Sequence, residues 1–321
     1  MGQRLFELGE REVIRRLRET IPGLDAIGDD SAVLKSIACP VVTTDSFFEG
    51  THFHRWWAPP QVLGRRLLEA TLSDIAAMGA RTGWVFAAVS LDPEMELDWL
   101  LSFYRGLAQR DDVVLAGGET VRGSSFGITL TAIGEGNDPE TLLRRSSLMP
   151  GDILWTGGLV GRALDAPRLL TEAGGMSGDP LSPVNSRFDG EFTDQLRAFL
   201  CPRAQLSLSW QLREAGVRCA IDISDGLFSE ALHLCEESAV DIILELEGSI
   251  FFSSVRGRPL EASAAGEDFV LLIGAPPGLD LSGYGCLRAG RAESGSGDLT
   301  VLLQGREVEV DSMGYDHMEV D

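Results

Sequence analysis

Paired cysteines are absent from this sequence. The 321-residue chain has five cysteines, and no two of them form a C-x-x-C motif. Disulfide frameworks and cysteine zinc sites both need cysteines at short, regular spacings. The dispersed set predicts reduced thiols in a cytoplasmic protein. Its members are Cys39, Cys201, Cys219, Cys235 and Cys286.

Basic residues are scarce relative to acidic ones. Lys and Arg total 27, Asp and Glu total 49, and the formal net charge is −22. A protein that binds duplex nucleic acid normally carries a basic stripe. The arginines of residues 4–19 instead alternate with glutamates at helical spacing, as on a solvated helix face. Nucleic acid and anionic membranes are therefore poor candidates as partners, and solubility is the simplest role for most of the acids.

Long apolar runs and histidines are few as well. No stretch reaches the roughly 18 apolar residues that a membrane-spanning helix needs. The first residues, MGQRLFELGERE, contain no apolar run, so we expect no signal peptide. Four histidines are too few and too dispersed for a histidine metal cage.

The remaining composition is that of an ordinary globular protein, with 44% hydrophobic and 24% charged residues. Domains usually span roughly 100–200 residues, so the length favours two domains. Apolar spacing predicts a helix over residues 6–21, with Phe6, Val13, Ile14, Leu17 and Ile21 near one face. Strands and helices then alternate to about residue 135. The predicted strands are 32–37, 39–48, 84–91, 113–118 and 127–136, and the helices are 62–80 and 95–111.

A polar, turn-rich segment at 136–152 marks the predicted boundary between a domain at 1–148 and a domain at 149–321. Strands are predicted beyond it at 152–159, 219–224, 241–247 and 268–274. Helices are predicted at 161–175, around 204–216 and at 227–238. Residues 174–192 are rich in Gly, Ser and Pro and predict a surface loop, to which we assign no role.

Carboxylates recur at the ends of apolar strands and in glycine-rich turns, where α/β proteins commonly gather ligands. Six short motifs carry them. They are IGDDSA (Asp29, Asp30), VVTTDSFFEG (Asp45), ATLSDIAAMGA (Asp74), VVLAGGETVRG (Glu119), AIDISDGL (Asp222, Asp225) and AAGEDFVLL (Glu267, Asp268).

Such a set of acids suits a magnesium–phosphate site. Magnesium takes oxygen ligands and commonly bridges one or two carboxylates and substrate phosphates. Acids that face a phosphate repel it unless a divalent ion lies between them. Glycines beside the acids, such as Gly118 and Gly226, let backbone N–H groups approach an anion. Thr43 and Thr44 could add oxygen ligands before Asp45.

A simpler alternative exists for each motif taken alone. GDD and SDG also form turns capped by the acidic side chain. GGET lacks the G-K-[ST] of a Walker A loop, which excludes that motif. Asp222 is harder to explain as a turn residue, because Ile221 and Ile223 flank it in an apolar strand where an unpaired acid is costly to bury. The motifs alone therefore leave a shared metal site and a set of capped turns both open.

Taken in order, the motifs resemble those of the thiamine-monophosphate kinase family. IGDDSAVL, TTDSFFEGTHF, LSDIAAMGA, GGET, DISDGL, GEDF and the terminal GYDHM follow the family order from about residue 5 to residue 318. The family is part of the aminoimidazole ribonucleotide synthetase superfamily. The resemblance implies an N-terminal α/β domain whose strands pair with a second subunit into a shared barrel. It also implies a separate C-terminal α+β layer and a homodimer.

The resemblance further implies transfer of the γ-phosphate of ATP to thiamine monophosphate, with several magnesium ions as cofactors. It implies four catalytic acids that also bind metal, Asp30, Asp45, Asp74 and Asp222. The other implied metal ligands are Thr43, Thr44, Glu119 and Asp225. The implied ATP contacts are Tyr104, Gly118, Glu119, Arg145 and Ser224. The implied substrate contacts are His52, Glu267 and Tyr315.

Some of these assignments have alternatives. His52 could be a surface imidazole beside Trp56 and Trp57, and Tyr315 lies near a terminus, where fraying is the default. The family usually has GGDT, so Glu119 in GGET carries a longer side chain and its metal role is open. Another ATP-dependent synthetase of the superfamily, or a non-catalytic nucleotide- or cation-binding relative, is the alternative function.

Overall fold

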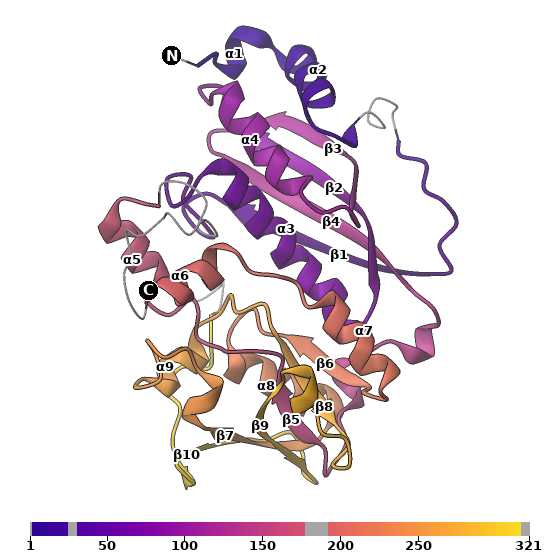
Figure 1. Cartoon of the computed structure of the whole chain (residues 1–321), viewed down its shortest axis with the longest axis vertical. Coiled ribbons are helices and arrows are strands. Elements are labelled where there is room, and N and C mark those ends of the chain that lie inside the picture. The colour runs from indigo at the N-terminus through magenta and orange to yellow at the C-terminus, as the bar shows by residue number, and fades with distance from the viewer. Residues whose placement is uncertain (1, 25–30, 177–191, 316–321) are drawn as a thin grey trace.

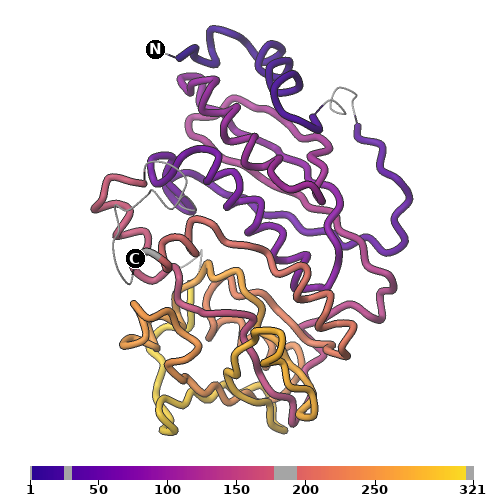
Figure 2. The backbone as a smooth tube through the Cα atoms, viewed as in Figure 1, coloured from indigo at the N-terminus to yellow at the C-terminus, as the bar shows by residue number. Residues whose placement is uncertain are grey.

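The computed structural model describes residues 2–24, 31–176 and 192–315. Within them the chain forms two sheets with helices packed against them (Figure 1). Figure 2 shows the two halves stacked along the long axis, with the indigo and magenta N-terminal half above the orange and yellow C-terminal half. In the described residues, no helix is long and apolar enough to cross a membrane.

The N-terminal sheet has the strand order β1-β4-β2-β3, so β1 and β3 are its edges. β4 pairs antiparallel with β1 and β2, and β2 pairs parallel with β3. Helices α3 (Pro60–Ala77) and α4 (Leu97–Leu107) cover one face of the sheet (Figure 1). The strands are β1 (Cys39–Phe48), β2 (Arg81–Leu91), β3 (Val114–Arg122) and β4 (Gly127–Gly136).

Helix α3 is buried along most of its length, and two glycines bring it against α4. A Cβ atom added at Gly64 would lie 2.1 Å from the carbonyl oxygen of Phe103, and one added at Gly106 would lie 2.1 Å from that of Gln61. Only glycine permits so close a backbone approach. Pro60 occupies the first turn, where its missing N–H costs nothing. This packing holds α3 deep in the molecule, between the sheet and the C-terminal half.

The prediction of one helix over residues 6–21 is wrong. The structure has α1 (Leu5–Leu8) and α2 (Glu10–Thr20), separated by Gly9 at φ 77°. This left-handed conformation ends the first helix, and glycine adopts it without steric cost. Phe6 is 57% exposed and does not share the buried face of α2, on which Val13 and Leu17 lie. The strand predicted over residues 32–37 is also wrong: these residues pair with none of the described strands, and Val33 is 97% exposed instead of packed in a sheet.

The C-terminal sheet has the order β11-β10-β7-β9-β5-β8-β6. Its strands are β5 (Ile153–Thr156), β6 (Cys219–Asp222), β7 (Asp241–Leu246), β8 (Leu271–Ala275), β9 (Leu287–Glu293), β10 (Leu299–Leu303) and β11 (Arg306–Glu307). The helices of this half are α5 (Ala166–Ala173), α6 (Phe192–Leu200), α7 (Leu206–Glu214), α8 (Leu227–Ser238) and α9 (Pro259–Ala264). Helix α5 begins later than predicted, after Asp165 at φ 67°.

Side-chain packing divides the molecule differently from the sheets. The chain changes sheet between β4 and β5, around the predicted boundary at residue 148. The hydrophobic cluster under the N-terminal sheet nevertheless also contains Leu170 of α5 and Leu196 and Phe199 of α6. The division at residue 148 therefore stays a prediction, and α5 and α6 join the two halves.

Candidate active site

A cavity of about 600 Å³ lies between β1 and α3 on one side and loops of the C-terminal half on the other. None of the described residues that line it is a Lys or an Arg. Because its lining is acidic, polar and aromatic, the cavity is electrostatically suited to cations or to anions that arrive with cations. Nine residues predicted from the sequence line it: Thr44, Asp45, His52, Asp74, Asp222, Ser224, Asp225, Glu267 and Tyr315.

Strand β1 directs two of its predicted residues toward α3. Burial alternates along this strand, and its even-numbered positions are exposed. Side chains of a strand point alternately to its two faces, so Thr43 and Asp45 lie on the face that meets α3. Thr43 Oγ1 donates a hydrogen bond to Asp74 Oδ2. Burial raises the pKa of Asp45 to about 6, and the charge of Asp74 acts in the same direction.

Asp222 brings a third carboxylate from the C-terminal half. It is the last residue of β6 and is 3% exposed. Burial raises its pKa well above the usual range, and the charge of Asp74 raises it further. The positive charge of Arg145, in a short 3-10 helix, acts in the opposite direction. Asp74 therefore acts on Asp45 and Asp222 alike, and the three acids form one acidic group.

This acidic group fits a divalent cation by its chemistry. All its donors are oxygens, which magnesium prefers, and burial together with the charge of Asp74 raises the pKa of both Asp45 and Asp222. In the described ranges, no three His, Cys, Asp or Glu side chains converge on one point to hold an ion. Magnesium commonly keeps water and phosphate ligands and takes only one or two carboxylates. The group thus offers partial ligation that a phosphate could complete.

The turn after β6 is held by a residue that the sequence analysis missed. Glu230, in the first turn of α8, is 2% exposed. Its Oε1 accepts hydrogen bonds from the backbone N–H of Ser224 (3.1 Å), the Ser224 hydroxyl (3.1 Å) and the backbone N–H of Asp225 (3.0 Å). The Ser224 hydroxyl donates its only proton to Glu230. It can therefore only accept a hydrogen bond from a ligand in the cavity. An acid in the first turn of a helix just after S-D-G was the available sequence signal.

The same turn anchors two other segments at the cavity. The backbone N–H of Glu267 donates to the carbonyl of Ser224 at 2.6 Å, and that of Tyr315 donates to the carbonyl of Asp225 at 2.9 Å. Tyr315 is therefore tied to the cavity rim, although sequence position alone favours fraying. Hydrogen bonds of the DISDGL turn thus assemble three motifs that lie far apart in the chain.

Two buried arginines form ion pairs with the acids of the GEDF loop. Arg66 Nη2 on α3 lies 2.9 Å from Glu267 Oε1. Asp268 is fully buried and accepts hydrogen bonds at 2.9 Å from the backbone N–H groups of Gly161 and Arg162. The Arg162 side chain also lies 3.6 Å from this carboxylate. Burial raises the pKa of Asp268 to about 6, and the Arg162 charge lowers it in part.

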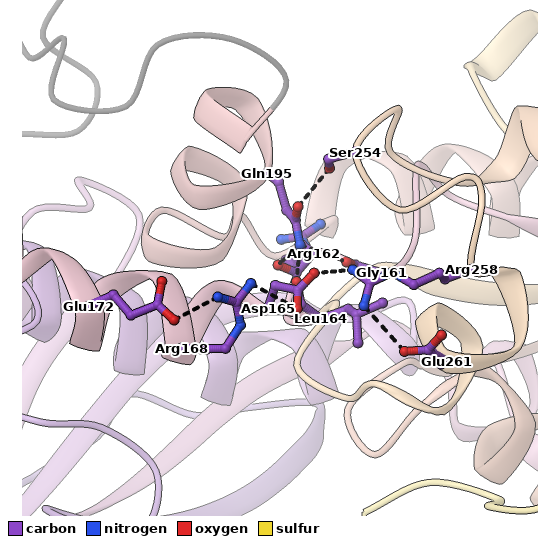
Figure 3. Close-up of polar contacts among 10 residues, drawn as sticks. All are labelled: Gly161, Arg162, Leu164, Asp165, Arg168, Glu172, Gln195, Ser254, Arg258 and Glu261. Atoms are coloured by element: carbon purple, nitrogen blue, oxygen red, sulfur yellow. Dashed lines mark hydrogen bonds and ion pairs between the residues drawn. The ribbon is translucent and has the colours of Figure 1, made fainter.

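Figure 3 shows the polar network that supports Gly161 and Arg162. The Gln195 side-chain amide, on α6, donates to the backbone carbonyls of Gly161 (3.3 Å), Arg162 (3.2 Å) and Leu164. Ser254 donates to the other end of Gln195 at 2.6 Å. Nearby, Asp165 pairs with arginines of α5 and of the segment before α9, as their dashed lines indicate. The network fixes the loop that binds Asp268, and through it the neighbouring Glu267.

Aromatic side chains form another wall of the cavity. The backbone N–H of Phe48 donates to His52 Nδ1 at 3.0 Å, so in the neutral ring the proton is on Nε2. The rings of His54 and Trp56 are stacked, with centroids 5.2 Å apart, and Trp57 meets His54 edge-on. Sequence reasoning missed His54, Trp57 and Phe269 as lining residues, because one apolar or aromatic residue carries no chemical pattern.

The other predicted residues do not line the cavity. Tyr104 is 5% exposed in the core of α4, and burial raises the pKa of its hydroxyl. Gly118 lies on edge strand β3, where an added Cβ would be 1.9 Å from the carbonyl of Ala87. Glu119 on the same strand accepts a hydrogen bond from the N–H of Thr120 at 2.9 Å.

Asp30 lies outside the described residues, as does its neighbour Asp29. The roles of Asp30, Tyr104, Gly118, Glu119 and Arg145 stay predictions. Among these residues, Arg145 has an electrostatic effect on the acidic group, because its positive charge acts on Asp222.

Comparison with known proteins identifies the fold. Residues 28–136 match the family model "AIR synthase related protein, N-terminal domain". The crystal structure of thiamine-monophosphate kinase from Stenotrophomonas maltophilia superposes with a TM-score of 0.74 at 29% identity, covering 92% of this chain and 95% of that one. The fold is therefore that of an AIR synthase related protein, as the motifs predicted.

Two related proteins identify the family within this fold. Thiamine-monophosphate kinase of Synechococcus elongatus is 33% identical over 85% of this chain and 84% of its own length. The enzyme of Leptospira interrogans is 31% identical over 84% of each chain. The chain belongs to the thiamine-monophosphate kinase family, and the resemblance stated from the motifs is confirmed.

Proposed function

We propose that this protein transfers the γ-phosphate of ATP to thiamine monophosphate, giving thiamine diphosphate and ADP. The observation that carries the proposal is the acidic group of Asp45, Asp74 and Asp222, which stands beside an aromatic wall in a cavity lined by no described Lys or Arg. Acids can serve a phosphate site only with cations, and aromatic rings suit a flat, cationic heterocycle.

The reaction needs orientation and charge neutralisation more than proton transfer. The acceptor is a phosphate that is already ionised at neutral pH, so no general base is required. Magnesium, when bound, would neutralise the charge that develops on the phosphates. We assign its ligands among Asp45, Asp74, Asp222 and Asp225 of the cavity. Thr43 and Thr44 on β1 would add oxygens, and Asp30 and Glu119 are further ligands predicted from the motifs.

The aromatic wall and the GEDF loop define the substrate end of the cavity. We assign His52, Glu267 and Tyr315 to thiamine monophosphate, and all three line the cavity. Ser224, whose hydroxyl proton is held by Glu230, would accept from the nucleotide or bind its cation. Tyr104, Gly118, Glu119 and Arg145 remain the other predicted ATP contacts. The cytoplasmic location remains a prediction from the cysteines.

We also propose that the protein is a homodimer in which the open face of the N-terminal sheet is covered. Helices cover one face of this sheet (Figure 1), and large apolar side chains on the opposite face are exposed. Val42 and Phe48 of β1 are 60% and 49% exposed, and Val121 of β3 is 50% exposed. Exposed apolar side chains gathered on one sheet face are typical of a protein interface. The barrel shared between two subunits, which the family resemblance implies, would bury these apolar side chains.

The decisive experiment is mass spectrometry of the products formed from ATP, magnesium and thiamine monophosphate. Thiamine diphosphate and ADP in equal amounts are expected, with neither formed when magnesium is chelated. ATP hydrolysis without thiamine diphosphate would favour another synthetase of the superfamily. Magnesium-dependent ATP binding with no product would favour a non-catalytic relative. Either of these two results would refute the proposal.

A further inference from the structure

Arg66 is a buried arginine that the acidic motifs do not explain. We propose that Arg66 is a positioning residue, which holds Glu267 at the substrate end of the cavity and thereby sets the affinity for thiamine monophosphate. The inference rests on the proposed function. Arg66 lies on α3 about two helical turns before Asp74, and its side chain is 1% exposed.

The guanidinium group of Arg66 joins both halves of the molecule. Its Nε donates to the carbonyl of Phe199 at 3.1 Å, and the group stacks over the Phe199 ring at 4.4 Å. Its Nη2 lies 2.9 Å from Glu267 Oε1. A buried charge is tolerated only when it is paired, so the carboxylate of Glu267 is what makes the burial of Arg66 possible.

The main chain at Glu267 is held in an unusual conformation by its neighbours. Its φ is 60°, a left-handed conformation that costs free energy for a residue with a side chain. The backbone is held on one side by the hydrogen bond to Ser224 and on the other by the buried Asp268. These contacts fix the main chain and leave the direction of the Glu267 side chain to Arg66.

The pair decides which part of Glu267 meets the ligand. Arg66 contacts Oε1, whereas the side chain is 31% exposed and lines the cavity. Oε2 is therefore the oxygen offered to a positively charged ring, and Arg66 keeps it oriented before the substrate arrives. Preorganisation of this kind improves affinity because less freedom is lost on binding. The residues proposed to contact ATP do not include Glu267, so we expect no such gain in the affinity for ATP.

The test compares Arg66→Met with the matched control Arg65→Met. Arg65 immediately precedes Arg66 on the same helix, and its Nη2 donates a hydrogen bond to the sulfur of Cys201. For Arg66→Met we expect the KM for thiamine monophosphate to rise about tenfold and the KM for ATP to change less than about twofold. The control should leave both values unchanged. Equal rises in the two KM values, or no rise, would show that Arg66 has only a structural role.

Glu267→Gln supplies a second, independent test. If Arg66 acts through Glu267, Arg66→Met should add less than about twofold to the KM for thiamine monophosphate in the Glu267→Gln background. A full additional increase in that background would overturn the inference. If Arg66→Met fails to fold, Arg66→Lys replaces it, because lysine keeps the positive charge but lacks the planar guanidinium group. Arg66→Lys should raise the KM for thiamine monophosphate by less than Arg66→Met, and this increase should disappear in the Glu267→Gln background.

The wild-type reaction separates this inference from the proposed function. A wild type that makes no thiamine diphosphate refutes the proposed function and the inference with it. A wild type that makes thiamine diphosphate, beside an Arg66→Met variant with an unchanged KM for thiamine monophosphate, refutes the inference alone.

Discussion

Asp45 on β1 and Asp74 on α3 carry like charges across the gap between strand and helix. The charge on Asp74 adds to burial in raising the pKa of Asp45 to about 6. Thr43, two residues before Asp45 on the same face of the strand, donates a hydrogen bond to Asp74. Strand and helix therefore hold two repelling acids at a fixed place, an arrangement that a bound cation would stabilise.

Replacement of Asp45 by asparagine should therefore remove turnover. We expect Asp45→Asn to lower kcat by at least about 100-fold, because the amide carries no charge to hold a cation. The measurement is thiamine diphosphate formation at saturating ATP and magnesium, with circular dichroism to verify the fold. Asp98→Asn, at an exposed position of α4, is the control and should behave as wild type. Near-normal activity of Asp45→Asn with unchanged magnesium dependence would contradict the assignment.

Glu230 should matter for both stability and activity. Glu230→Ala removes the acceptor of three hydrogen bonds in the Ser224–Asp225 turn, and we expect a loss of about 2–4 kcal/mol in the free energy of unfolding. The turn also positions Ser224 and Asp225, so kcat should fall even at temperatures where the variant is folded. Urea unfolding and steady-state kinetics measure the two effects.

Glu236→Ala is the control for Glu230, because Glu236 is exposed on the same helix. It should change neither the free energy of unfolding nor kcat. A Glu230→Ala variant that loses stability but keeps full kcat would show that the turn is not part of the site.

Asp268 should make stability depend on pH in a defined direction. Its pKa is about 6 in the folded protein against an ordinary 3.8, so between these values the folded state binds more protons than the unfolded state. Stability from this group is therefore highest near pH 4 and falls as the pH rises through 6, by at most about 3 kcal/mol.

The comparison with Asp268→Asn isolates this contribution. The variant should be less stable than wild type at pH 4, because an amide fits the two backbone donors and Arg162 poorly. The stability difference should shrink as the pH rises to 7. Urea unfolding at several pH values measures it, and a difference that grows with pH would contradict the burial-raised pKa.

The open face of the N-terminal sheet should be a dimer interface. Val42→Asp combined with Val121→Asp places charges where the barrel would bury apolar side chains, and we expect the dimer to dissociate to monomers. Analytical ultracentrifugation measures the mass. Met149→Asp is the control, since Met149 is 63% exposed and belongs to neither sheet. A wild-type monomer, or a dimer that survives both charges, would refute this interface.

Local patterns in the sequence predicted much of the fold. Alternation along β1 and the apolar strand before Asp222 were visible because strand periodicity depends only on neighbouring residues. The single helix predicted over 6–21 failed at Gly9, whose conformation ends α1. A glycine within an otherwise helical pattern is compatible with either outcome, and packing decides between them.

The site was predicted where a residue belonged to a recognisable motif. Arg66, Glu230, His54 and Trp57 belong to none, because an arginine, a glutamate or a ring has many uses and its partner is distant in the chain. Tyr104 and Gly118 matched motifs, yet the structure puts the tyrosine in the α4 core and the glycine on an edge strand.

The sequence by itself determined that the protein carries acids at strand ends and turns, that it lacks basic stripes and paired cysteines, and to which family its motifs belong. The tertiary structure decided which of these acids lie close enough to interact. It brought Asp74 within electrostatic reach of both Asp45 and Asp222, tied the DISDGL turn to Glu267 and Tyr315, and paired Glu267 with a buried arginine of α3. Electrostatic interaction and hydrogen bonding act over a few ångströms in space, and separation along the chain does not report that distance.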